Sequence, residues 1–132
     1  MNWKKKQILG LLIISNIWVT GCAGKLEKAQ KIASQAGFKS RVIRTTNFNL
    51  QAFYRITNIG NPLTIYIEGD GQAWVTRTQP SSNPTPRDPL TLRLAALDSS
   101  ENIMYLARPC QYVNINREKL CKTPYWTHKR FS

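Results

Sequence analysis

The stretch that most constrains the fold is residues 63–71, Leu-Thr-Ile-Tyr-Ile-Glu-Gly-Asp-Gly. β-Branched and aromatic residues fill its first half, Pro62 precedes it and Gly69 follows, which is typical of a short buried strand that ends in a turn. Glycines at both ends of the turn let the backbone bend sharply and leave its N–H groups uncovered, so that a ligand oxygen can approach. The turn of Gly69, Asp70 and Gly71 is therefore a candidate oxyanion site, and a plain strand-ending turn is the alternative.

An irregular loop and a helix follow this turn. Residues 78–89 contain four prolines and two serines, which exclude regular structure, and this loop is expected to lie over the candidate site. Asp88 stands where a helix cap is favoured, and Pro89 is at the expected first helical position. Three leucines then recur at the spacing of one helix face, which predicts a helix to about residue 97. They are Leu90, Leu94 and Leu97.

A second strand is expected after that helix, because residues 102–107 contain the continuous apolar run Ile-Met-Tyr-Leu-Ala. Such runs occur where both faces of a sheet are covered. Strand, loop, helix and strand together make a βαβ unit, which predicts a right-handed crossover and two parallel strands. The glycine turn is then expected at the carboxyl edge of the sheet, where open α/β sheets bind ligands.

The segment before residue 63 is expected to contribute one helix and two strands. Residues 24–36 have apolar positions at helical spacing, with Gly37 as C-cap, and the helix's three lysines fit either a membrane surface or a solvated face. A strand is predicted over residues 40–46, and alternating apolar and polar residues predict a half-buried strand over residues 48–56. Residues 58–62, Asn-Ile-Gly-Asn-Pro, predict a hairpin-like turn that makes the second and third strands antiparallel neighbours.

Residues 1–21 have the layout of a secretory signal. Three lysines near the N-terminus precede residues 8–19, an apolar stretch too short to span a bilayer comfortably. Val-Thr-Gly-Cys at residues 19–22 resembles a bacterial lipobox, in which cleavage precedes the cysteine and the thiol carries the lipid. The resemblance implies a signal peptide over residues 1–21 and a lipid anchor on Cys22; an uncleaved anchor helix with an incidental cysteine is the alternative.

The residue after Cys22 and the net charge of the chain indicate where in the cell the protein is expected. Ala23 stands where an aspartate would resemble an inner-membrane retention signal, so the resemblance favours the bacterial outer membrane, facing the periplasm. The chain carries 19 basic and 7 acidic residues; removing the three signal lysines leaves 16 against 7, a net charge of +9. Export argues against nucleic acid as the partner of this charge, and anionic lipid head groups are the partner expected instead.

Two cysteines remain when Cys22 is assigned to lipid. An even number of cysteines in an oxidising compartment is normally paired, so a disulfide between Cys110 and Cys121 is expected. A metal site is the rival interpretation, and it lacks ligands because His128 is the single histidine. No metal and no cofactor is therefore predicted.

Four segments together resemble the α/β-hydrolase fold, and more narrowly exported bacterial lipoproteins of that fold, over about residues 53–131. The resemblance implies that residues 22–132 form a partial α/β-hydrolase domain: an antiparallel hairpin followed by a βαβ unit, the incomplete N-terminal part of the sheet. It also implies that the loop at Gly69, Asp70 and Gly71 supplies one oxyanion-hole N–H. The segments are Glu-Gly-Asp-Gly at 68–71 with Trp74, Pro-Thr-Pro-Arg-Asp-Pro at 84–89, Ala-Arg-Pro-Cys-Gln-Tyr at 107–112 and Tyr-Trp-Thr at 125–127.

The chain departs from that family at the catalytic residues. An α/β-hydrolase needs a G-x-S-x-G elbow followed by an acid and a histidine, and this elbow is absent. His128 precedes the place of the nucleophile and is expected to be exposed. We therefore expect the N-terminal part of an exported serine hydrolase without catalytic residues, whose small-molecule ester substrate belongs to the full-length family. A small non-catalytic basic envelope lipoprotein is the alternative.

The lipobox predicts a covalent product. Mass spectrometry of membrane fractions should find a lipid on Cys22 and should find residues 1–21 removed. A soluble chain with an intact N-terminus would contradict the lipobox interpretation.

Overall fold

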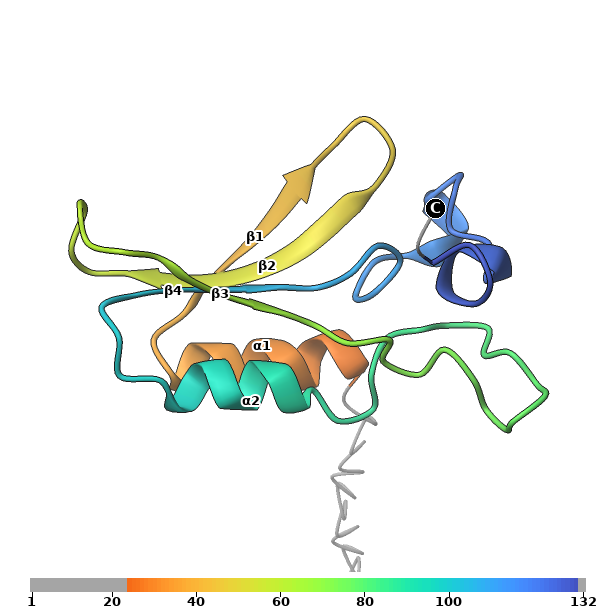
Figure 1. Cartoon of the computed structure of the whole chain (residues 1–132), viewed down its shortest axis with the longest axis horizontal. Helices are drawn as coiled ribbons and strands as arrows, with labels where there is room; N and C mark the ends of the chain where they lie inside the picture. Colours follow the sequence, from red (N-terminus) through yellow and green to blue (C-terminus); the bar gives the residue numbers. More distant parts are fainter. Residues whose placement is uncertain (1–23, 131–132) are drawn as a thin grey trace, which may run out of the picture.

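The computed structural model describes residues 24–130, which form a four-stranded mixed sheet with two helices packed on one of its faces (Figure 1). The chain is therefore an α/β-type protein, as expected. No helix in this part of the chain is long and apolar enough to cross a membrane. The elements are α1 Lys25–Gln35, β1 Lys39–Arg44, β2 Asn49–Ile56, β3 Thr64–Ile67, α2 Leu90–Leu97 and β4 Asn102–Leu106, followed by 3-10 turns at Ile115–Arg117 and Thr123–Trp126.

The strand order is β1-β2-β4-β3. β1 pairs with β2 and β2 with β4 in the antiparallel sense, whereas β3 and β4 are parallel and joined through α2. The predicted βαβ unit is confirmed. The predicted antiparallel pairing of the second and third strands is wrong, because β4 lies between them.

The turn at residues 57–61 closes on β4 instead of forming a hairpin. The Asn102 side-chain oxygen accepts hydrogen bonds from the N–H groups of Thr57 and Asn58, each at 3.2 Å. Its amide nitrogen donates to the carbonyl oxygens of Asn58 and Asn61 at 2.7 and 2.9 Å. One buried side chain thus satisfies the backbone of this turn and fixes the start of β4 beside the end of β2.

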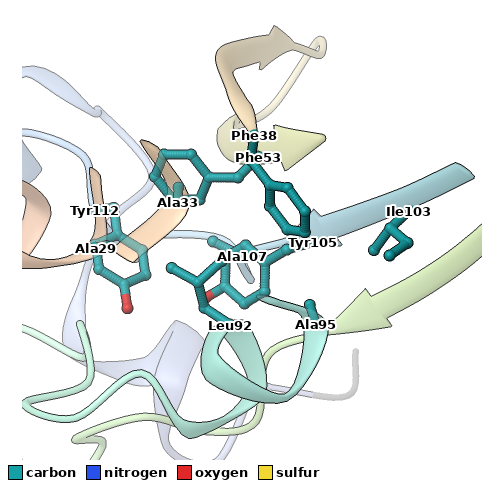
Figure 2. Packing of buried hydrophobic residues seen from close by; sticks show 10 residues of the cluster. All are labelled: Ala29, Ala33, Phe38, Phe53, Leu92, Ala95, Ile103, Tyr105, Ala107 and Tyr112. Atoms are coloured by element: carbon teal, nitrogen blue, oxygen red, sulfur yellow. The ribbon is translucent and has the colours of Figure 1, made fainter. Parts of the chain in front are cut away.

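The core lies between the sheet and the helices. The rings of Phe53 and Tyr105 stack with centroids 5.9 Å apart, and Figure 2 shows Leu92 of α2 beside Tyr105. Alanines of both helices belong to the same buried cluster, and their small side chains let the helices lie close to the sheet. The buried cluster is Ala29, Ala33, Phe38, Phe53, Leu92, Ala95, Ile103, Tyr105, Ala107 and Tyr112.

The alternating pattern of residues 48–56 predicted a strand but not its covered face. Phe53 faces the helices and is fully buried. Tyr54, one of the predicted apolar positions, pairs with Met104, which pairs with Ile65, and paired residues share a sheet face. That face carries no helix within residues 24–130 (Figure 1).

α1 ends as predicted at a glycine in the left-handed conformation. Gly37 has φ +74°. Its N–H donates to the Ser34 carbonyl at 3.0 Å, and the Phe38 N–H donates to the Ala33 carbonyl at 2.9 Å. These two bonds are the Schellman pattern that closes a helix and turns the chain toward the next element.

The start of α2 differs from the expectation by one residue. Pro89 is the N-cap, and no side chain caps the helix. The Asp88 carboxylate, predicted as the cap, instead pairs with Lys28 and Arg93 at N–O distances of 3.7 and 3.0 Å. These exposed pairs link the N-terminal halves of the two helices and contribute at most about 1 kcal/mol each.

β3 was expected to be a buried strand, and its isoleucines are instead exposed. β4 is its single neighbour within the described residues. Ile65 and Ile67 lie on the sheet face that carries no helix within the described residues, and they are 51% and 64% exposed. The outer edge of β3 presents backbone groups that no other described strand pairs. Natural edges are usually protected by charge, proline or a bulge, and residues 64–67 contain no charge and no proline.

This edge predicts self-association. Purified residues 23–132 should sediment as oligomers or bind a hydrophobic dye, because an open apolar strand is a template for strand pairing. Ile65→Lys should reduce the oligomer fraction in analytical ultracentrifugation, whereas Ile59→Lys, in the exposed turn after β2, should leave it unchanged. A monomeric wild-type chain with a cooperative thermal transition would contradict the prediction.

Candidate functional site

The glycine turn lies at the carboxyl end of β3, beside the segment that follows β4 (Figure 1). The Glu68 N–H donates to the Leu106 carbonyl at 2.9 Å, which carries the parallel pairing one residue past β3. Because both strands end here, residues 68–71 and 107–112 meet at one edge of the sheet. This is the location that the βαβ pattern predicted for a ligand site.

The turn leaves two consecutive backbone donors available. The Gly69 N–H donates to the carboxylate of Glu68 at 3.0 Å, and the Gln72 N–H donates to the Pro84 carbonyl at 2.9 Å. Between them, the N–H groups of Asp70 and Gly71 make no hydrogen bond within residues 24–130, and both residues are exposed. Adjacent free N–H groups on an exposed turn can stabilise negative charge on a ligand oxygen.

Gly71 is held in a conformation and a space that other residues do not fit. Its φ is +62°, and a Cβ there would lie 2.1 Å from the Pro84 carbonyl oxygen and 2.7 Å from Gln111 Nε2. At Gly69 no atom lies within 4 Å of a Cβ. The second glycine of the turn is therefore the one that the fold requires.

Gln111 fixes the turn from the opposite strand end. Its Nε2 donates to the Gly69 carbonyl at 3.0 Å, and its Oε1 accepts from the Arg108 N–H at 3.0 Å. The side chain is almost fully buried, so both amide atoms are satisfied within the protein. Nothing in the local sequence around residue 70 pointed to this residue.

Asp70 connects the turn to the C-terminal segment. Its carboxylate accepts hydrogen bonds from the guanidinium groups of Arg108 and Arg130. Arg108 Nη2 also donates to the Arg130 carbonyl at 3.1 Å. Asp70 therefore joins the glycine turn to the segment after β4 and to the C-terminal segment.

A small cavity of about 100 Å³ lies beside Asp70. The rings of Phe48 and Tyr125, which meet edge to face with centroids 5.4 Å apart, belong to its lining. The cavity therefore combines aromatic and basic side chains. Its lining consists of Phe48, Asp70, Pro84, Arg108, Pro109, Gln111, Tyr125, Trp126, Lys129 and Arg130.

The irregular loop packs beside the turn, where it was expected. The Lys25 ammonium donates to the Thr85 carbonyl at 2.8 Å and to the Gln72 side chain at 3.1 Å. Burial, aided by the positive charge of Arg87, lowers the pKa of Lys25. The Thr85 hydroxyl accepts from the Tyr112 N–H at 2.8 Å, so α1 and the segment after β4 both hold the loop.

The predicted cysteine pair is confirmed at disulfide-bonding distance. The sulfur atoms of Cys110 and Cys121 lie 2.16 Å apart. Both residues are buried with Ala73 and Trp126, and the Trp126 indole N–H donates to the Ser81 carbonyl at 3.0 Å. The cross-link and the indole together attach the C-terminal turns to the loop over the site.

Glu68 and Asp70 have different surroundings, because the chain turns after β3 and Asp70 faces Arg108 and Arg130. The buried carboxylate of Glu68 accepts a 2.7 Å hydrogen bond from the hydroxyl of Tyr105. Burial raises the pKa of Tyr105, and the charge of Glu68 raises it further. Burial likewise raises the pKa of Tyr112. The two carboxylates therefore do not form an acid–base pair.

The remaining candidate residues are placed as follows. His128 is exposed, and its Nδ1 lies 3.4 Å from the Thr127 hydroxyl. Within residues 24–130 no three His, Cys, Asp or Glu side chains are grouped to hold a metal ion. Cys22 lies outside the described residues.

Comparisons with known proteins leave the family open. No protein-family model matches the chain, and the comparisons with curated proteins and with solved structures find no match.

The two glycines of the turn predict different substitution costs. Gly71→Ala should destabilise the fold by about 2 kcal/mol or more, because it adds a left-handed alanine and a backbone clash. Gly69→Ala should stay within about 0.5 kcal/mol, since its Cβ meets open space. Urea denaturation of both variants measures this, and equal costs would contradict the geometry.

The buried tyrosines predict a loss of stability in alkali. A tyrosine whose pKa is higher in the folded than in the unfolded state stabilises the fold at pH values below the unfolded-state pKa of about 10. This stabilisation is lost as the pH rises above about 10. The free energy of unfolding should therefore fall above about pH 10, and Tyr105→Phe should make this fall shallower. An unchanged pH slope in Tyr105→Phe would contradict the assignment.

Proposed function

We propose that this chain is the N-terminal part of an α/β-hydrolase of the exported lipoprotein kind, and that Gly69, Asp70 and Gly71 form half of an oxyanion hole. The observation that carries the proposal is the pair of free N–H groups on the loop after β3. In α/β-hydrolases the loop after the third strand donates one N–H to the oxyanion, and the residue after the nucleophile donates the other. The position of the loop after β3 and its two N–H donors support the proposal.

The strand order supports the same lineage. In that fold the strand corresponding to β3 lies between β4 and a further strand that carries the nucleophile. Within residues 24–130, β3 has β4 on one side and no strand on the other, and its isoleucines on the helix-free face are exposed. An apolar strand with an unprotected edge is suited to a central position in a larger sheet.

The proposed role of these residues is binding and electrostatic, without covalent chemistry. An oxyanion hole stabilises charge that develops on an acyl oxygen, and removing one donor typically costs a factor of about 100 or more in rate. The nucleophile, its base and its acid would come from outside this sequence. The substrate class is a small ester or related acyl compound, acted on by the full-length family.

Cys22 is proposed as the lipid anchor that holds the chain in the bacterial cell envelope, with the outer membrane favoured. The lipobox pattern and the excess of basic residues support this placement. A small non-catalytic basic envelope lipoprotein is the second candidate function, and it is favoured by the absence of a G-x-S-x-G elbow from the sequence.

Two measurements test the proposal. The chain should hydrolyse p-nitrophenyl esters at the rate of buffer alone, and the genomic sequence beyond the codon for Ser132 should encode a G-x-S-x-G elbow in some frame. Turnover that disappears when one of the chain's own serines is replaced would refute the inactive assignment. If no downstream reading frame encodes a G-x-S-x-G elbow, the non-catalytic lipoprotein would be favoured.

A further inference from the structure

The leucine stripe of α2 faces outward. Leu90, Leu94 and Leu97 are 55%, 51% and 83% exposed, whereas Leu92 and Ala95 of the same helix are fully buried against the sheet. The core therefore uses the other side of α2. The three leucines that predicted the helix from the sequence are not among the residues that form the buried cluster or pack against it, and a large exposed apolar patch marks an interaction surface.

A groove between α1 and α2 continues this stripe. The two helices lie side by side on one face of the sheet (Figure 1), so the groove is on the outer surface of the helical layer. Apolar side chains predominate along it, and only Gln35 and Arg93 are polar. Its lining consists of Ile32, Gln35, Ala36, Leu90, Arg93, Leu94, Ala96 and Leu97.

Basic residues accompany the apolar groove. Lys28 and Lys31 are exposed on α1, and Arg93 is exposed on α2. Asp88 pairs with Lys28 and Arg93, so the net positive charge of this face is modest. The exposed leucines therefore contribute more to membrane binding than the charge does. Exposed leucines with flanking lysine and arginine are the composition of helices that lie in a membrane interface.

The proposed anchor would hold this surface close to a bilayer. Cys22 is three residues before Lys25, the first residue of α1, and three extended residues span about 11 Å at most. α1 therefore begins within about the depth of the head-group region, where amphipathic helices bury their apolar side by about 5–10 Å.

We propose that the outer face of α1 and α2 docks on the lipid bilayer, with Leu90, Leu94 and Leu97 at the boundary of head groups and acyl chains. The inference rests on the proposed lipid anchor at Cys22. The anchor supplies attachment, and the leucine stripe supplies orientation. The docked chain turns the uncovered sheet face, with Tyr54 and Met104, away from the membrane.

Spin labelling of the full chain, purified from membranes and reconstituted in phosphatidylethanolamine and phosphatidylglycerol vesicles, tests this orientation. A label at Leu94→Cys should collide with dissolved oxygen and be shielded from an aqueous nickel chelate. A label at Ile56→Cys, an exposed apolar position on the opposite sheet face, is the matched control and should show the reverse. The mass of each sample reports separately whether Cys22 carries a lipid.

A second variant tests the leucines themselves. A label at Gln35→Cys in the groove should lose its oxygen collisions when Leu90, Leu94 and Leu97 are all replaced by glutamine. A lipid-modified chain whose Leu94 label is as accessible to nickel as the Ile56 label would overturn the docking proposal and leave the anchor standing. A shielded Leu94 label on a chain without lipid would support docking and remove the anchor.

Discussion

β4 pairs with both β2 and β3, and this double pairing fixes where the other elements lie. It makes Tyr105 the centre of the sheet, opposite Phe53 on one side and Tyr66 on the other. It also directs α2 across one face, where α1 packs beside it. Because β3 and β4 are parallel, their carboxyl ends coincide, and residues from two distant segments meet around the glycine turn.

Local sequence pattern predicted the elements well. Helical spacing and Gly37 located α1, and the order of strand, loop, helix and strand located the βαβ unit. The pairing of the strands was harder to predict from the sequence. Residues 58–62 have the composition of an ordinary turn, and the contact that decides the pairing comes from Asn102, more than forty residues later. Periodicity also failed to show which side is covered: Phe53 is buried although it lies between the apolar positions of the pattern.

In the candidate site, too, the residues within the turn could be predicted from the local sequence, and the residues that contact it from distant segments could not. Gly69, Asp70 and Gly71 were identified from the sequence because glycines in a turn after a strand have a direct backbone consequence. Gln111 and Arg130 were missed, since their contacts with the turn arise only when the two strand ends are brought together. The cysteines could be paired from their number and expected compartment, without any knowledge of the fold.

Cross-strand nuclear Overhauser effects in isotope-labelled protein test whether β4 separates β2 from β3. Backbone contacts are expected from Tyr105 to Phe53 in the antiparallel pattern and to Tyr66 in the parallel pattern. Direct antiparallel contacts between β2 and β3, with β4 at the edge of the sheet, would contradict this strand order and would remove the basis for the candidate site.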